Sequence, residues 1–83
     1  MKPGKSMDLK QILIDIARAI VDTPDAVKVE ETVNGDDIEL VLTVAEDDTG
    51  MVIGRHGRIA KAIRQVMKAA ASKCGKHVTI EIQ

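Results

Sequence analysis

The chain has 83 residues, of which 45% are hydrophobic and 30% are charged, a composition typical of one folded domain rather than of a disordered tail. It contains no Phe, Tyr or Trp, which excludes an RNA recognition motif, because that fold stacks bases on aromatic side chains. The net charge of −1 is unevenly divided: residues 1–50 carry five basic and twelve acidic side chains, whereas residues 51–83 carry seven basic and one acidic side chain, so one part of the surface is suited to a polyanion.

The ends of the chain and its cysteine content bear on domain organisation and compartment. Cys74 is the single cysteine and forms no disulfide within the chain. No apolar run approaches the ~20 residues of a membrane span, and residues 1–6 lack the apolar segment of a secretory signal. We therefore expect a flexible leader at residues 1–6, one domain at residues 7–83, and a cytoplasmic protein with no membrane partner.

Residues 8–22 have the spacing of an amphipathic helix with one buried face. Ser6 or Asp8 is suited to the amino-terminal cap, and Thr23 followed by Pro24 ends the helix, because a residue before proline avoids helical angles. The apolar positions recur three and four residues apart and are Leu9, Ile12, Leu13, Ile16, Ala17 and Ile20.

Alternation then replaces the helical period and predicts two strands. Val27, Val29 and Val33 fall on one side of the first strand, and Glu31 interrupts that side, which an edge position or a bulge would explain. Asn34-Gly35 predicts a hairpin with a type I′ turn, since both residues tolerate positive φ. In the second strand one face packs inward and the other is largely polar apart from Val41; the inward residues are Ile38, Leu40, Leu42 and Val44.

The basic half of the chain begins beyond the acidic stretch 46–49. Met51-Val52-Ile53 predicts a short helix ending at Gly54, and a long helix starts near Arg58 and ends at Cys74-Gly75. Its predicted buried stripe is Ile59, Ala62, Ile63, Val66, Met67 and Ala70, and its other side is a basic ridge of Arg58, Lys61, Arg64, Gln65 and Lys68. A last strand at 77–82 completes the chain.

The predicted order is helix, strand, strand, short helix, loop, helix, strand. This order indicates an α+β fold in which helices cover one face of a three-stranded sheet.

The segment Gly54-Arg55-His56-Gly57 is the strongest functional signal. Two glycines three residues apart let the backbone turn closely and leave the amides open to an approaching ligand. The first turn of the following helix adds free N–H groups, a setting that binds phosphate. A bare pair of glycines more often marks only a tight turn between helices, so its position in the fold must decide its role.

The run from Val52 to Ile59 resembles the I-G-x-x-G-x-x-I signature of K-homology (KH) domains. Its place after two strands and before a long helix is that of the type II, αββααβ form. More narrowly, the chain resembles the small bacterial single-KH proteins of the KhpA family, on the Asp22–Val27 connection, the approach Gly50–Gly54 and the helix start Gly57–Arg64. The resemblance covers nearly all of residues 7–83.

The resemblance implies binding of single-stranded RNA, with about four nucleotides clamped at the glycine loop. It places phosphates against Gly54, Arg55, His56 and Gly57, with Arg58 and Lys61 beside them. Val52, Ile53, Ile59 and Val41 of the second strand would form an aliphatic groove for the bases. Single-stranded DNA stays an alternative ligand, because no residue is an evident reader of a 2′-hydroxyl.

Membership of this family further implies an RNA chaperone or post-transcriptional regulator that affects cell-envelope and cell-length homeostasis. Such a protein acts as a homodimer or with a larger KH-containing partner. No cofactor is implied.

Two rival interpretations are an enzyme and a protein-interaction module. The chain lacks the G-x-x-x-x-G-K and G-x-G-x-x-G patterns of nucleotide-binding enzymes, and no catalytic set emerges. Cys74 and His77 have the spacing of half a zinc site without a second pair, so we expect no metal. A KH-fold dimerisation module without RNA affinity remains the alternative, although the Arg-His loop and the basic ridge favour RNA.

Overall fold

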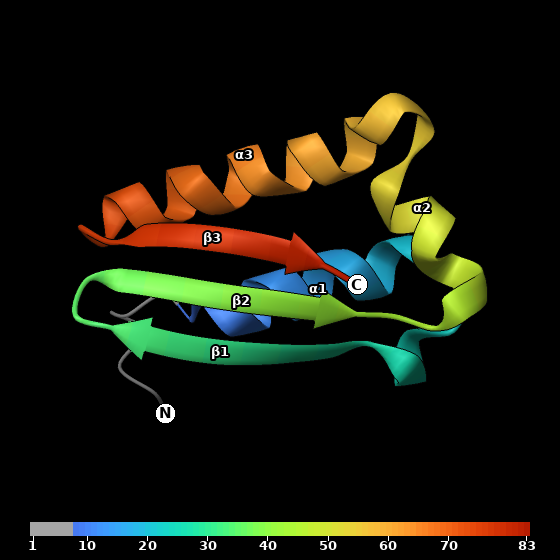
Figure 1. Cartoon of the computed structure of the whole chain (residues 1–83), viewed down its shortest axis with the longest axis horizontal. Coiled ribbons are helices and arrows are strands. Elements are labelled where there is room, and N and C mark those ends of the chain that lie inside the picture. Colours follow the sequence, from blue (N-terminus) through green and yellow to red (C-terminus); the bar gives the residue numbers. More distant parts are fainter. Residues whose placement is uncertain (1–7) are drawn as a thin grey trace.

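Figure 1 shows a computed structural model of the chain, which describes residues 8–83. The predicted leader, residues 1–6, and Met7 lie outside the described residues. The helices and strands follow the predicted order, and 3₁₀ turns occupy Pro24–Ala26, Glu46–Asp48 and Arg55–Gly57. The elements are α1 (Leu9–Ile20), β1 (Lys28–Asn34), β2 (Asp37–Thr43), α2 (Thr49–Ile53), α3 (Arg58–Lys73) and β3 (His77–Ile82).

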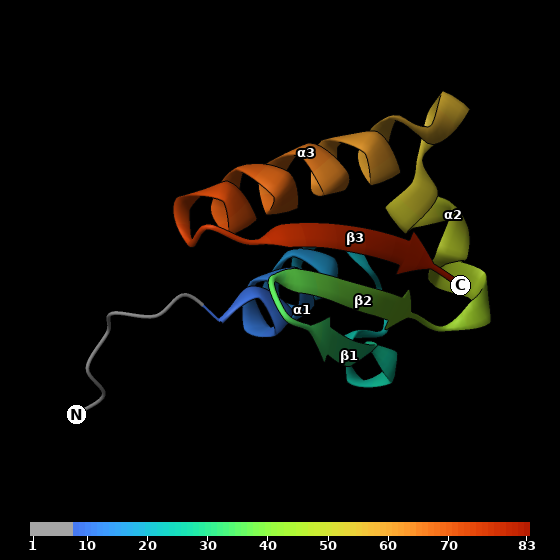
Figure 2. The same cartoon turned by 60° about the vertical axis from the view of Figure 1, so that its left-hand side comes forward.

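The sheet has the strand order β1-β2-β3, with β1 antiparallel and β3 parallel to the central β2. The parallel pair follows from the connection, because α2 and α3 carry the chain back across one face before β3 begins. Figures 1 and 2 show α1 behind the sheet and α3 running beside β3. The α+β prediction and the αββααβ order of a type II KH fold are confirmed.

The helix α1 begins at the predicted cap and buries one face. The carboxylate Oδ1 of Asp8 accepts a hydrogen bond from Gln11 N at 3.2 Å, so Asp8 is the cap. Leu9, Leu13 and Ala17 are buried against the sheet and α3. No helix in the described residues is long and apolar enough to cross a membrane.

The hairpin is confirmed, but its turn lies one residue later than expected. Asn34 pairs with Asp37, so Gly35 and Asp36 form the two-residue turn. Gly35 has φ +60° and is the one residue of the turn with positive φ. Positive φ at the first central position is the pattern of a type II′ turn, not of the predicted type I′.

The strand β1 is an edge strand, and this position explains the interruption at Glu31. Its pairing with β2 is unbroken from Lys28 to Asn34, so no bulge is present. Val33 lies on the same side of β1 as Val29, as predicted, since Val33 pairs with Ile38 and Val29 with Leu42, but its side chain is 55% exposed. Val33 lies at the hairpin end of the edge strand, and beyond Val29 the inward side of β1 is exposed.

The buried stripe of α3 differs from the predicted one. Met67 is fully buried and Ile63 nearly so, as expected, but Val66 is 52% exposed. Ile59 is 37% exposed and Ala62 is exposed as well. The helix is rotated about its axis so that small residues face the core in place of Ile59, Ala62 and Val66. The buried residues of α3 are Ala60, Ile63, Met67 and Ala71.

Asp48 is the one buried charged residue of the described chain, at 2% exposure. It does not cap α2; its Oδ2 accepts a hydrogen bond from Thr23 N at 2.9 Å. This bond ties the connection after α1 to the connection before α2, which presents the glycine loop.

We expect Asp48→Ala to lower the free energy of unfolding by about 1–3 kcal/mol, because it leaves Thr23 N–H without its acceptor. Asp47→Ala changes the same charge at the exposed neighbour and is expected to cost less than about 0.5 kcal/mol. Urea denaturation of both variants measures the difference, and equal losses would contradict the role assigned to Asp48.

Candidate nucleic-acid interface

The glycine loop is a tight turn built on three positive φ angles. Gly54 has φ 76° and ψ 173°, a conformation open to glycine almost alone. His56 has φ 58° and Gly57 has φ 73°, both left-handed. The N–H of Gly57 donates to the carbonyl oxygen of Gly54 at 3.1 Å and closes the turn. The loop projects beyond the sheet between α2 and α3 (Figure 1).

The amino end of α3 opens directly onto this loop. Gly57 occupies the cap position and has no side chain to bond the N–H groups of the first turn. Of these groups, the N–H of Arg58 donates to the carbonyl oxygen of Arg55. The side chains of Arg55, His56 and Arg58 are exposed around the helix end. The positive end of the helix dipole and two guanidinium charges in one place favour an anion.

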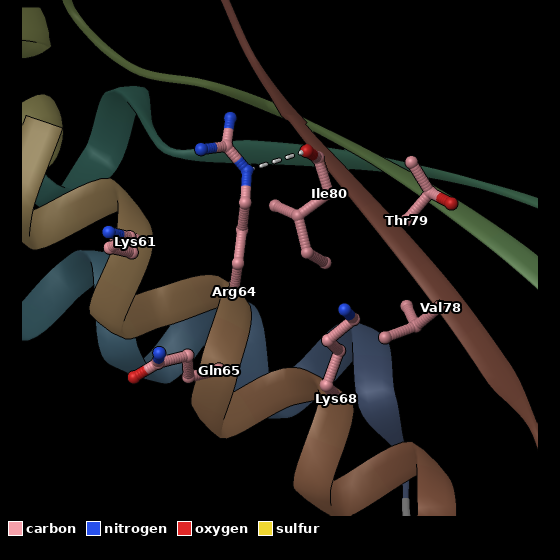
Figure 3. A pocket seen from close by; sticks show the side chains of 7 residues that line it. All are labelled: Lys61, Arg64, Gln65, Lys68, Val78, Thr79 and Ile80. Atoms are coloured by element: carbon pink, nitrogen blue, oxygen red, sulfur yellow. Dashed lines mark hydrogen bonds between the residues drawn. The ribbon is translucent and has the colours of Figure 1, made fainter.

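A groove of about 460 Å³ lies between α3 and β3 (Figure 3), and Lys61, in the first turn of α3, is its lining residue nearest the loop in the sequence. Its floor is apolar, because Val78 and Ile80 of β3 line it with side chains that are 9% and 6% exposed. Its helix wall carries three cations, and none of the lining residues is acidic. The lining residues are Lys61, Arg64, Gln65, Lys68, Val78, Thr79 and Ile80.

Arg64 is held across this groove by a hydrogen bond. Its Nε donates to the carbonyl oxygen of Ile80 at 3.3 Å (Figure 3). This oxygen lies on β3, an edge strand of the sheet. The bond fixes a planar guanidinium between helix and strand, where such a plane can stack on a flat ligand.

A family model described as KhpA/KhpB, KH domain, matches residues 10–82. The chain belongs to this KhpA/KhpB KH-domain family. The resemblance seen in the glycine loop and the helix start is thereby confirmed over nearly the whole described chain. No solved structure is a significant match.

The chain matches several curated relatives over almost their full length. A protein from Clostridium acetobutylicum named RNA-binding protein KhpA is 54% identical over 74 residues, which are 89% of this chain and 99% of the relative. The protein of the same name from Clostridium perfringens is 49% identical, also over 89% of this chain and 99% of the relative. The protein of that name from Treponema pallidum is 40% identical, over 88% of this chain and 91% of the relative.

The structure brings most of the predicted site residues of this KH domain to one end of the molecule. Gly54, Arg55, His56 and Gly57 form the exposed turn, Arg58 follows it, and Lys61 begins the groove. Ile53 and Ile59 flank the loop with exposures of 39% and 37%.

Two predicted groove residues are corrected. Val52 is fully buried and supports α2 from within the core, so its side chain cannot touch a base. Val41 lies between the buried Leu40 and Leu42 on β2, and therefore points to the sheet face opposite the helices. It does not border the loop.

The wall of the groove that the sequence did not reveal is β3. Residues 78–80 were predicted only as part of the last strand, yet they line the groove opposite α3. The topology could have predicted this position of residues 78–80. A strand that follows β2 after two helices is suited to parallel pairing with β2, and its free edge then lies beside α3. Residues 8–83 contain no group of three metal-ligating side chains.

Proposed function

We propose that the chain binds single-stranded RNA through the glycine loop and the α3–β3 groove. The observation that carries this proposal is their arrangement: a helix amino end without a side-chain cap, exposed Arg55 and Arg58 beside it, and, one turn further along α3, a groove without acidic lining that starts at Lys61. About four nucleotides would be clamped, with phosphates at residues 54–57. The relatives named as RNA-binding proteins support the same ligand class.

The groove suits bases although the chain has no aromatic residue. Val78 and Ile80 offer an apolar floor, and the guanidinium of Arg64 offers a plane on which a base can stack. Lys61 and Lys68 border the path of the phosphates. A single module of this kind should bind weakly, since it lacks the ~1–3 kcal/mol that each base stacked on an aromatic ring contributes.

The proposed ligand mode makes the affinity depend on salt. Each neutralised phosphate of a single strand contributes about −0.7 to the log–log salt slope, so three or four contacts predict a slope of roughly −2 to −3. Fluorescence anisotropy of an unstructured RNA oligonucleotide between 50 and 200 mM salt measures it, beside DNA of the same sequence. A flat response would show that the loop and groove bind no phosphate.

We further propose that two KH modules act together, as two copies of this chain or as this chain with a larger KH-containing protein. An exposed apolar row of Ile59, Ala62 and Val66 lies on α3. Successive helix residues are about 100° apart, which places this row on the flank of α3 opposite the groove-lining Lys61, Arg64 and Lys68. The row can therefore be covered by a partner while the groove stays open, and two linked modules multiply affinity.

Val66→Asp is expected to shift the chain toward monomer, because a pairing surface would bury this charge. Sedimentation velocity at several protein concentrations measures the change. The matched control is Ala19→Asp, because Ala19 is an exposed residue of α1. A wild-type chain that stays monomeric at all concentrations would contradict self-pairing and leave only the larger partner.

The role in the cell that we propose is that of a cytoplasmic RNA chaperone or post-transcriptional regulator acting on cell-envelope and cell-length homeostasis. Its support is membership of the family together with the proposed RNA contact. Sequencing the RNA crosslinked to the wild type, beside a variant with a charge-reversed loop, tests it. Recovery of the same transcripts by both would contradict a role that depends on the loop.

A further inference from the structure

The α3–β3 groove does not end at its main hollow. A second hollow of about 200 Å³ lies at the carboxyl end of α3 and shares Lys68 and Val78 with the first. Its lining residues are Lys68, Ser72, Lys76, His77 and Val78. The two hollows therefore adjoin at Lys68 and Val78, and together their lining residues on α3 run from Lys61 to Ser72.

This second hollow is rigidly built. Lys76 N donates to the carbonyl oxygen of Ala71 at 2.9 Å, and Gly75 N donates to that of Ser72 at 3.1 Å, the two bonds of a Schellman cap. His77 N donates to the carbonyl oxygen of Asp36 at 2.8 Å. The backbone that presents Lys76 is therefore tied to both the helix and the hairpin.

Its charge suits a phosphate. None of the lining residues is acidic, and two of them, Lys68 and Lys76, are cationic. The Nζ of Lys76 pairs with Asp36 Oδ1 at 3.6 Å, but these side chains are 38% and 75% exposed. An exposed pair contributes little, so Lys76 can exchange this partner for a phosphate.

In the proposed binding mode, a ligand of four nucleotides would not reach this hollow. Four joined nucleotides contain only three phosphodiesters, which the loop and the adjoining cations would engage. The 16 residues of α3 span about 24 Å, whereas four stacked nucleotides span roughly 14 Å. Roughly seven stacked nucleotides cover the length of the helix.

We propose that the hollow of Lys68, Ser72, Lys76 and His77 is a second phosphate site for the same RNA strand, which passes through the groove and extends the binding site beyond four nucleotides. This inference rests on the proposed RNA binding at the loop. It assigns the carboxyl end of α3 a role in measuring the length of the bound strand.

The test compares uridine oligonucleotides of four and eight nucleotides by fluorescence anisotropy at 50 and 200 mM salt. The octamer is expected to show a steeper salt slope, by about 0.7 for each added phosphate contact. Lys76→Gln is expected to remove one such contact, so the octamer's ratio of affinities at the two salt concentrations falls by about 2.6-fold. Its binding of the tetramer should be unchanged.

Lys73→Gln is the matched control, because Lys73 is an exposed lysine of the same helix end that lines neither hollow. It is expected to leave both oligonucleotides unaffected. Ser72→Glu, which places a carboxylate in the hollow, is expected to weaken binding of the octamer alone. Melting curves of all variants report folding.

Equal salt slopes for tetramer and octamer would overturn the second site while leaving the loop proposal intact. Equal effects of Lys73→Gln and Lys76→Gln would also overturn it, since net charge alone would then explain the weaker binding. Failure of the wild type to bind either oligonucleotide would instead overturn the proposed function itself.

Discussion

Replacing Arg55 and His56 together with aspartate is expected to weaken single-stranded RNA binding by about 10- to 100-fold at 50 mM salt. With His56 neutral, the double variant changes the loop by three units of charge. Each unit near a phosphate is worth about 1 kcal/mol at 4 Å in water, and 1.4 kcal/mol is tenfold in affinity. The salt slope should become shallower by about 0.7 for each phosphate that the loop no longer neutralises.

The fold should survive this double substitution. Both side chains are exposed, and aspartate is among the residues that tolerate the left-handed φ of 58° at position 56. Lys28→Asp/Asn34→Asp is the matched control, since it makes the same charge change on exposed β1, the edge strand farthest from β3 in the sheet. It should retain most of the affinity.

Unchanged RNA binding by the loop variant, with a normal melting curve, would exclude the loop as the phosphate clamp. The chain would then fit the alternative of a KH-fold interaction module, whose exposed apolar row on α3 serves a protein partner. Equal weakening in the loop variant and the control would show that overall charge, not the loop, attracts RNA.

The features predicted correctly from the sequence are those set by local chemistry. Gly75 ends α3 with φ 71° because a left-handed cap favours glycine, and Asp8 caps α1 because its carboxylate reaches the third following N–H. The glycine loop belongs to the same class, because its conformation depends on Gly54 and Gly57 themselves. Such signals need no knowledge of distant contacts.

The buried stripe of α3 was misplaced because two apolar rows share this helix. One contains the larger Ile59 and Val66, and the other contains Ala60 and Ala71 beside the common Ile63 and Met67. The first row was assigned to the core from the sequence because its side chains are larger. The small residues are buried instead where α3 packs on β3 and α1, and this close approach is a tertiary property that periodicity does not contain.

The strand wall of the proposed base groove was also predicted on another strand, for a related reason. Its predicted strand wall was β2, through Val41, but β2 is the central strand and only β3 presents a free edge to α3. Which strand is central depends on a parallel pairing between residues 37–42 and 77–82, far apart in the sequence. The hydrogen bond from Arg64 to Ile80 follows from that pairing and from nothing local.

Gly54→Ala is expected to cause the largest decrease in stability among single substitutions in the loop, about 2–6 kcal/mol. The angles φ 76° and ψ 173° are strained for alanine by about 1–3 kcal/mol. The added Cβ would also overlap Ile59 Cγ1 and lie 2.9 Å from both Cβ and N of Ile59, and such overpacking costs about 1–3 kcal/mol. Urea denaturation measures the decrease.

Two other glycines separate these causes. Gly57→Ala meets no atom within 4 Å, so it should cost only the left-handed strain of about 1–2 kcal/mol. Gly50→Ala, inside α2 and equally open, should stabilise the protein by about 0.5–1 kcal/mol.

The overlap itself is tested by a double-mutant cycle with Ile59→Ala. Removing Ile59 Cγ1 relieves the closest collision and leaves the backbone strain, so Gly54→Ala should cost less in the Ile59→Ala background than alone. An equal cost in both backgrounds would contradict the contact between the first glycine and Ile59. Because that contact links the loop to the first turn of α3, coupling in the cycle would mean that Ile59 sets the position of the proposed phosphate clamp.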